Sequence, residues 1–190
     1  MALMLSQDVT ADALLDRDPL ALLLGMLLDQ QVPMERAFAA PYQLQQRLGH
    51  ELDVHELASY DRDALTELFA TPPALHRYPR SMAVRVQDIC RALVERYDGD
   101  VTGLWRDVAD ASELLDRLVG LPGYGMQKAQ IFVALLGKQR NVKPAGWREV
   151  AGPYGDDGVY RSIADVTDAD SLAKVREHKQ QVKMAARAKR

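Results

Sequence analysis

Residues 121–129 read LPGYGMQKA, a turn with two glycines and a proline between two apolar segments. The first segment ends at Leu118, and the second restarts at Ile131. Such a turn exposes backbone N–H groups at the start of a helix with no side chains in front of them, an arrangement that binds anions. Gly123 and Gly125 would let a phosphate approach the backbone and would supply the positive φ that we expect in the turn.

The rest of the chain has a helical pattern nearly throughout, with few β-branched residues and no alternating run that would mark a strand. Asp, Pro and Gly residues supply start and stop signals that divide this pattern into separate helices. They predict helices over residues 19–31, 33–48, 53–60, 61–69, 79–96, 112–119 and 126–138, and a last one from residue 167. We therefore expect an all-α fold.

Composition limits the class of protein. The 190 residues are 47% hydrophobic, enough for one domain or for two small lobes that share an interface. The longest apolar stretch, residues 19–28, is about half the length that a membrane span requires, and we find no leader sequence, so we expect a cytoplasmic protein. The single cysteine, Cys90, excludes an internal disulfide and a four-cysteine iron–sulfur cluster. We expect no cofactor and no metal bound by side chains, because the four histidines are scattered.

Charge is distributed unevenly along a chain whose net charge is −3. Between residues 126 and 150 there are five basic residues and one acid. Residues 171–190 carry a net charge of +6, so the other 170 residues carry −9. A charged run is usually a solvated helix face, but the basic segment that follows the glycine turn fits anion binding. In this segment Lys128, Lys138 and Arg140 are the expected phosphate contacts.

The pattern LxxLPGYGxxxAxxxV at 118–133 resembles the helix-hairpin-helix motif, which grips a DNA phosphate backbone without reading the base sequence. Two upstream segments extend the resemblance, LLLGMLLDQQVPMERAF at 22–38 and AVRVQDICRAL at 83–93. In order and separation, the three segments are similar to those of the helix-hairpin-helix (HhH-GPD) DNA glycosylase superfamily. Endonuclease III and the 3-methyladenine DNA glycosylase II group typify this superfamily. The resemblance covers residues 18–136.

The resemblance implies a two-lobed helical bundle. One lobe would comprise residues 18–136, including the hairpin, and the other would combine residues 1–17 with residues 137–190 and their basic tail. The partner that it implies is duplex DNA, with damaged DNA expected, and no membrane. We expect a monomer associated with the nucleoid.

The resemblance also implies where the DNA would lie. The hairpin residues Gly123, Tyr124 and Gly125 would hold the phosphates of one strand through main-chain N–H groups, and Gln127 would also contact the DNA. A base would flip into the cleft between the lobes. Gln30 or Gln31 would lie near the flipped base and could hydrogen-bond to base edges. Hairpins of this family often hold a monovalent cation through main-chain carbonyls, here those of residues 121–124.

The catalytic residues depart from the family pattern. Bifunctional members carry a nucleophilic lysine two residues after the second hairpin glycine, and that position is Gln127 here. Lys128 lies one residue later, about 100° around the helix, and should point elsewhere. Active members also carry an aspartate about 18–20 residues beyond the lysine position, which falls on Ala, Gly and Trp at 145–147. The nearest carboxylates are those of Glu149, Asp156 and Asp157.

Two functions are compatible with these features. One is a monofunctional DNA N-glycosylase, a hydrolase that uses water and one of these three relocated acids and has no lyase step. The other is a non-catalytic protein that binds damaged DNA on the same scaffold. A third, a helical interaction protein, would leave the glycine turn and the basic segment unexplained. We favour the glycosylase, because the family is overwhelmingly enzymatic and a carboxylate can move a few positions while the cleft persists.

Overall fold

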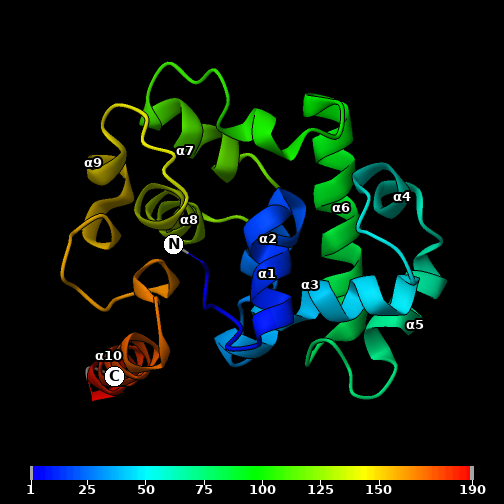
Figure 1. The fold of residues 1–190 in the computed structure, drawn as a ribbon, viewed down its shortest axis with the longest axis horizontal. Helices are drawn as coiled ribbons and strands as arrows, with labels where there is room; N and C mark the ends of the chain where they lie inside the picture. The colour runs from blue at the N-terminus through cyan, green and yellow to red at the C-terminus, as the bar shows by residue number, and fades with distance from the viewer. Residues whose placement is uncertain (1, 189–190) are drawn as a thin grey trace.

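The computed structural model describes residues 2–188, in which ten α-helices and three short 3-10 helices occur without any strand. The prediction of an all-α fold is therefore confirmed for this part of the chain. Figure 1 shows the helices as three neighbouring groups, with α1 to α3 in the centre, α4 to α6 on one side and α7 to α10 on the other.

The bounds of the first six helices are α1 (Val9–Arg17), α2 (Pro19–Leu28), α3 (Met34–Leu48), α4 (Val54–Ser59), α5 (Arg62–Ala70) and α6 (Pro79–Tyr97). The later elements are η1 (Val101–Leu104), α7 (Ala111–Val119), α8 (Met126–Gln139), α9 (Trp147–Ala151), η2 (Gly152–Tyr154), η3 (Ile163–Asp165) and α10 (Ala169–Ala188). The sequence pattern missed α1 and α9, and it placed the end of α2 three residues too late.

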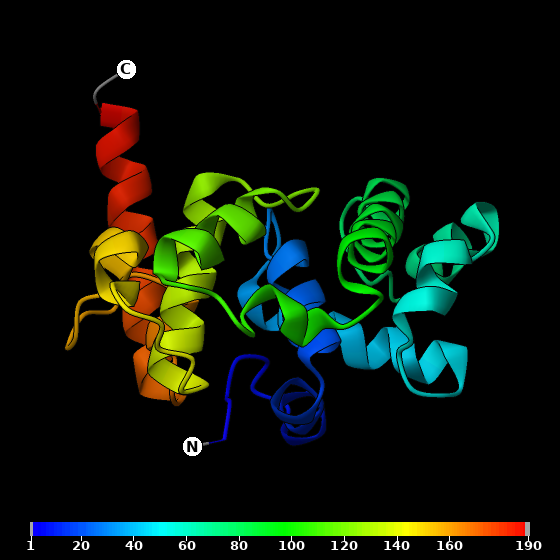
Figure 2. The same cartoon turned by 90° about the horizontal axis from the view of Figure 1, so that it is seen from above.

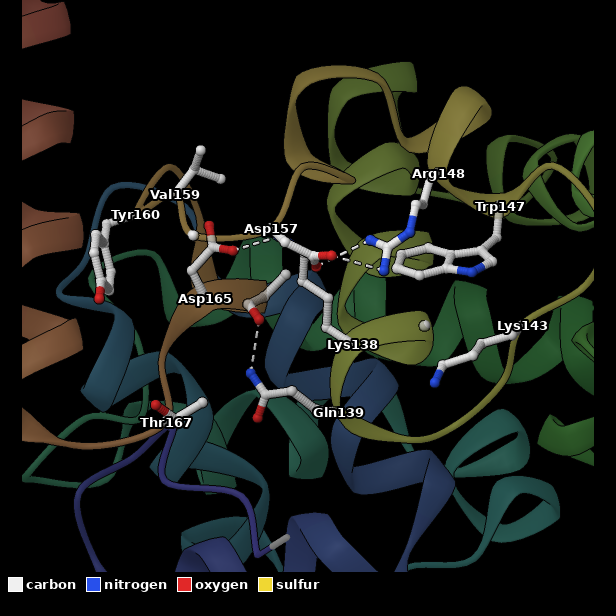
Figure 3. Close-up of a pocket in the computed structure, with 13 residues that line it drawn as sticks. Lys138, Gln139, Lys143, Trp147, Arg148, Asp157, Val159, Tyr160, Asp165 and Thr167 are labelled. Atoms are coloured by element: carbon white, nitrogen blue, oxygen red, sulfur yellow. Dashed lines mark hydrogen bonds and ion pairs between the residues drawn. The ribbon is translucent and has the colours of Figure 1, made fainter.

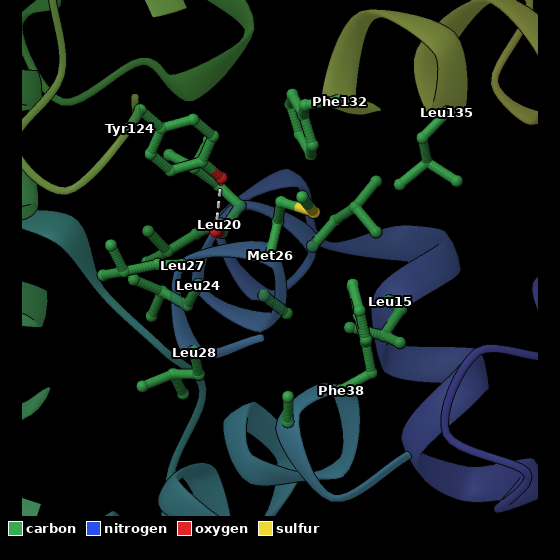
Figure 4. Packing of buried hydrophobic residues seen from close by; sticks show 14 of the residues in the cluster. Leu15, Leu20, Leu24, Met26, Leu27, Leu28, Phe38, Tyr124, Phe132 and Leu135 are labelled. Atoms are coloured by element: carbon green, nitrogen blue, oxygen red, sulfur yellow. Dashed lines mark hydrogen bonds between the residues drawn. The ribbon is translucent and has the colours of Figure 1, made fainter. Parts of the chain in front are cut away.

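The central helix, α2, accounts for how the other helices pack, because they surround it. Asp18 caps it by accepting the N–H of Leu20, and Pro19 occupies its first turn, where a missing N–H costs least. Every residue from Leu20 to Leu28 is buried, because α2 is apolar on all sides and other helices surround it. Figure 4 shows leucines of α2 packed against Phe38 from α3 and Phe132 from α8.

The contacts between helices show how the chain is packed around α2. α1 packs on α2 and α3, whereas α8 packs on α7, α9 and η3. The two segments of the predicted second lobe do meet at one ion pair, between Asp16 and Arg140 at 2.6 Å. The predicted boundary at residue 136 falls inside α8, and the division into two lobes stays a prediction. Most contacts of α1 are with the helices before α7, and most contacts of α8 are with the elements from α7 onward.

Candidate nucleic-acid interface

The two glycines of the hairpin turn have different backbone conformations. Gly123 has φ of +81°, and a Cβ there would lie 2.6 Å from Cδ1 of Leu27, so this position requires glycine. Gly125 has φ of −79° and ψ of 169°, which any residue can adopt, and a Cβ there would have no atom within 4 Å. The expected positive φ is thus correct for Gly123 and wrong for Gly125. The second glycine instead leaves open space in front of α8.

The N-terminus of α8 is bare. Gly125 is its N-cap, no side chain accepts a hydrogen bond from its first turn, and Gly125, Met126 and Gln127 are all exposed. The first N–H groups of a helix have no intrahelical acceptor, so these groups are left for water or for a ligand. The N-terminus of a helix also carries a partial positive charge, which favours an anion such as phosphate.

Tyr124 anchors the hairpin to α2. Its hydroxyl donates to the carbonyl oxygen of Leu23 at 2.8 Å, and its ring packs edge-on against Phe132 with centroids 5.9 Å apart (Figure 4). Burial raises the pKa of the Tyr124 hydroxyl well above its usual value. The side chain of Tyr124 therefore faces the core, and the expected contact with DNA stays a prediction that concerns its main chain alone.

Lys128 fixes the start of α8 to the end of α2. Its Nζ donates to the carbonyl oxygens of Met26 at 2.6 Å and Leu27 at 2.9 Å, two of the carbonyls that lack a partner within α2. Burial lowers the pKa of Lys128 to about 8, although the nearby Asp29 carboxylate opposes the shift. The expected phosphate contact is thus corrected, since the ammonium group points into the protein.

The lowered pKa of Lys128 predicts a pH-dependent stability. Between about pH 8 and pH 10 the unfolded lysine, with its usual pKa of 10.5, keeps a proton that the folded lysine has lost. The unfolded state then binds more protons, so the free energy of unfolding of the parent should rise with pH relative to that of Lys128→Met. The limiting slope is about 1.4 kcal/mol per pH unit. Denaturant unfolding of both proteins measures this difference, and a difference that is constant or falls with pH would contradict the assignment.

The turn between α2 and α3 holds the two glutamines in different states. Gln30 is fixed: its Oε1 accepts from Nη1 of Arg85 at 2.7 Å, its Nε2 donates to Leu27, and its carbonyl bonds Nε2 of His76 at 3.0 Å. Gln31 is exposed, has φ of +57°, and has no side-chain hydrogen bond to any described residue. Such strained positions concentrate at functional sites. Of the two expected base-edge contacts, Gln31 therefore has the available amide.

An exposed tyrosine lies beside this turn, and the sequence interpretation missed it. The buried His76 that bonds Gln30 also accepts the backbone N–H of Tyr78 at 3.0 Å. The Tyr78 side chain is 41% exposed, and the guanidinium of Arg77 lies 5.3 Å from its ring centroid. An exposed ring among arginines is a surface on which nucleic-acid bases stack. The signal in the sequence was the HRYPR stretch at 76–80, an aromatic residue among basic residues before a helix.

Gln127, at the position of the family's lysine, borders a pocket. Its Nε2 donates to the hydroxyl of Tyr154 at 2.8 Å. The pocket has a volume of about 330 Å³ and is also lined by Pro153, Arg161, His178, Lys179 and Val182. The later residue that meets Gln127 is therefore Tyr154, which follows the expected aspartate position in the chain. Among the described residues, no carboxylate lines this pocket.

The three acids expected from the sequence lie at different distances from this pocket. Glu149 is exposed on α9 and makes no ion pair within residues 2–188. Asp157 is paired with Arg148 and is 74% exposed. Asp156 is 59% exposed and pairs at 2.8 Å with Arg161, which lines the pocket. Asp156 is therefore the nearest of the three.

Asp29, which the sequence interpretation did not consider, lies near Lys179, one of the residues that line this pocket. It is the C-cap of α2, its side chain is only 13% exposed, and its Oδ2 lies 3.9 Å from Nζ of Lys179. Lys179 in turn lines the Gln127 pocket. The charge of Asp29 also acts on Lys128, so this carboxylate lies between the start of α8 and α10. No periodicity or spacing in the sequence pointed to it.

Lys138 and Arg140 have structural partners. Lys138 forms an almost buried ion pair with Asp165 at 2.6 Å, and Arg140 pairs with Asp16 at the same distance. Both lie at the end of α8 opposite to the hairpin, about 17 Å (Lys138) and about 20 Å (Arg140) along the helix from Gln127. Figure 3 shows Lys138 and Asp165 in a second pocket, which also holds the Arg148–Asp157 pair and Trp147. The expectation that these two cations bind phosphates is thus corrected by their engagement far from the turn.

The remaining predictions concern metal ions and the membrane. Within residues 2–188 no group of three His, Cys, Asp or Glu side chains lies close enough to hold a metal ion. In the hairpin the Leu121 carbonyl accepts the N–H of Tyr124 at 3.1 Å, and the next two carbonyls, of Pro122 and Gly123, accept no such bond. A monovalent cation held by these carbonyls stays a prediction. None of the described helices is long and apolar enough to cross a membrane.

Two helices joined by a glycine turn, with a bare helix N-terminus beside a fixed α2, define a helix-hairpin-helix protein. The family model described as the HhH-GPD superfamily base excision DNA repair protein matches residues 24–188, most of the chain. The chain therefore belongs to the HhH-GPD superfamily of base excision DNA repair proteins and acts on DNA, as the sequence resemblance predicted. A comparison with curated proteins finds no match.

Proposed function

We propose that this protein is a monofunctional DNA N-glycosylase, which removes an altered base from duplex DNA and leaves the sugar–phosphate backbone intact. Membership of a base excision repair family supports the substrate class. The observation that carries the finer proposal is Gln127, an amide at the position where bifunctional relatives need a lysine, with Lys128 turned into the protein. Gly125 and the bare start of α8 would hold the phosphates, and Gln31 would lie at the base.

The proposed reaction is hydrolysis. The bond between C1′ of the sugar and the base nitrogen breaks, and its electron pair leaves with the base. The oxygen of a water molecule bonds to C1′, and a carboxylate accepts the proton that this water loses. Such a carboxylate also stabilises the positive charge that develops on the sugar. The reaction needs no nucleophilic amine and no cofactor.

For the carboxylate we propose Asp29. Its side chain is largely shielded from solvent, whereas Asp156 and Asp157 are mostly exposed and each is paired with an arginine. A carboxylate in a partly desolvated site interacts more strongly with a developing positive charge than one in water does. Asp29 also precedes Gln30 and Gln31 directly, so it lies beside the residues expected at the flipped base.

The proposal predicts that no Schiff base forms with DNA. Incubation with abasic-site DNA and borohydride should trap no covalent adduct, because Gln127 cannot form one and the Lys128 amine is hydrogen-bonded to two carbonyls. Denaturing electrophoresis measures both the adduct and strand cleavage. An adduct that forms with the parent and disappears in Lys128→Ala would overturn the monofunctional assignment.

Tyr78 should contribute to binding of DNA that contains a lesion. Replacement by alanine removes an exposed ring next to the Gln31 turn, and loss of base stacking costs about 1–3 kcal/mol. We therefore expect affinity for lesion DNA to fall by about 5- to 150-fold in a fluorescence titration. Tyr160 is similarly exposed on the far side of α10, so Tyr160→Ala is the matched control. Equal effects of the two changes would contradict a specific role for Tyr78.

One observation favours a second candidate, a non-catalytic protein that binds damaged DNA. Among the described residues, no carboxylate lines the pocket beside Gln127, and Tyr154 is the residue that the chain brings back to it. In that case the scaffold would recognise a distorted or damaged duplex and leave excision to another protein. Tight binding of lesion DNA without base release would identify this second function.

A further inference from the structure

The C-terminal helix α10 extends beyond the rest of the molecule. Ser171, Leu172 and Val175 in its first half are buried, whereas every residue from Lys179 to Ala188 is exposed. Figure 2 shows its last turns clear of the other helices. Helices in proteins are stabilised mostly by packing, so the exposed turns at the end of α10 are a feature that a partner would explain.

The position of this free end follows from its contacts along α8. α10 starts beside η3, which is tied to the C-terminal end of α8 through Lys138 and Gln139. At His178, Lys179 and Val182 it passes Gln127, in the first turn of α8. The two helices therefore run in opposite directions. Residues 183–188 continue about 9 Å past the hairpin end of α8.

Four cations of α10 share one face of the helix. Arg176, Lys179, Lys183 and Arg187 follow each other at intervals of three and four residues, which places them within about 80° of arc. We call these four residues the basic stripe. Lys174 is on the opposite face, where it pairs with Asp170 and lies over the ring of Tyr160.

Acids of the central helices hold the first half of the basic stripe in place. Arg176 pairs with Glu35 at the start of α3, and Lys179 lies 3.9 Å from Asp29 at the end of α2. Lys183 and Arg187 have no acidic partner among residues 2–188. The two ion pairs therefore direct the face of α10 that carries the basic stripe toward the turn between α2 and α3. The two outer cations, Lys183 and Arg187, are left without an acidic partner among the described residues.

We propose that Lys183 and Arg187 form a second phosphate-binding surface, which contacts the backbone of the duplex held by the hairpin. The inference rests on the proposed function, because it requires DNA at the hairpin. The bare N-terminus of α8 holds phosphates through main-chain N–H groups, and the outer half of the basic stripe adds two side-chain cations beyond it. Their charge matches phosphate, and binding would release counterions from the DNA.

The salt dependence of binding tests this inference. Each phosphate contact contributes about 0.9 to the slope of log K against log salt concentration, or about eightfold in affinity at 0.1 M salt. In the full-length protein, the double variant Lys183→Gln with Arg187→Gln should make this negative slope shallower by about 1.8 for a mixed-sequence duplex. Lys174→Gln should leave it unchanged. The double variant Lys183→Gln with Gln181→Lys keeps the net charge but moves one cation off the basic stripe. It should make the slope shallower by about 0.9.

The outcomes separate this inference from the proposed function. If the two-cation variant keeps the parent's slope and affinity, the stripe is not a DNA contact. The inference also fails if Lys174→Gln weakens binding as much as Lys183→Gln, because net charge alone would then explain both. A protein whose duplex affinity is unaffected by Gly125→Val would contradict the hairpin itself. Loss of binding in Gly125→Val with unchanged stripe variants would overturn only the role of α10.

Discussion

Gly125→Val should abolish most duplex DNA binding and leave the fold unchanged. The backbone at this position is extended, and a Cβ has no atom within 4 Å, so the new side chain fits without strain. It would, however, occupy the space in front of the first N–H groups of α8. Each hydrogen bond from such a group to a charged acceptor is worth about 1.5–3 kcal/mol. Loss of one or two of them lowers affinity by about 10-fold to more than 1,000-fold.

A titration at fixed salt, together with the thermal midpoint of unfolding, measures this effect. Ala70→Val adds the same kind of bulk at an exposed end of α5, away from the hairpin, and should change neither quantity. Gly123→Val should behave differently from both, because a positive φ and the contact with Leu27 make it strained, and it should lower the unfolding midpoint. A stable Gly125→Val protein that binds DNA like the parent would rule out the hairpin as the phosphate site.

Asp29→Asn should lower the rate of base release by about 10²- to 10⁴-fold, the usual contribution of a general base. The substitution keeps the size of the side chain but removes the ion pair with Lys179 and the charge that acts on Lys128, so denaturant unfolding of the variant is the control for its stability. Affinity for lesion DNA should fall little, because the carboxylate is proposed to act on water and on the sugar as the bond breaks. Single-turnover kinetics separates this rate from product release.

The other acids provide the controls. Asp157→Asn and Glu149→Gln change carboxylates that lie away from the Gln127 pocket and should keep the rate of the parent. Asp156→Asn removes the partner of Arg161, which lines the pocket, so a modest loss is expected there. If Asp156→Asn loses more activity than Asp29→Asn, the acid expected from the sequence replaces Asp29 in the mechanism.

The fold and the hairpin were predictable because local chemistry specifies them. Asp18 followed by a proline starts α2, and a positive φ at Gly123 follows from the only residue type that adopts it without cost. The three family segments fixed the superfamily, which the family model confirms. The boundary of α2 was misjudged because Asp29 and the two glutamines after it are compatible with a helix, whereas the structure turns there.

The roles of individual charged residues were not predictable. The sequence does not show whether a basic side chain contacts water, DNA or a carbonyl oxygen of the protein. Lys128 and Lys138 were expected at phosphates, yet one caps α2 and the other pairs with Asp165, a residue far along the chain. The buried position of the Tyr124 side chain was also not predictable, because its hydroxyl donates a hydrogen bond to Leu23, which is far away in the sequence. The proposed role of Asp29 rests in part on its position beside Lys179 of α10, a long-range contact that no local pattern encodes.

Direct detection of the released base tests the central claim. The parent protein is incubated with duplex oligonucleotides that carry uracil, hypoxanthine, an alkylated purine or oxidised guanine, and mass spectrometry detects free base and intact strands. We predict release of at least one of these bases, with an abasic site left in an uncut strand. Tight binding of the same duplexes without release of any base would contradict the glycosylase assignment and favour a protein that recognises damage without removing it.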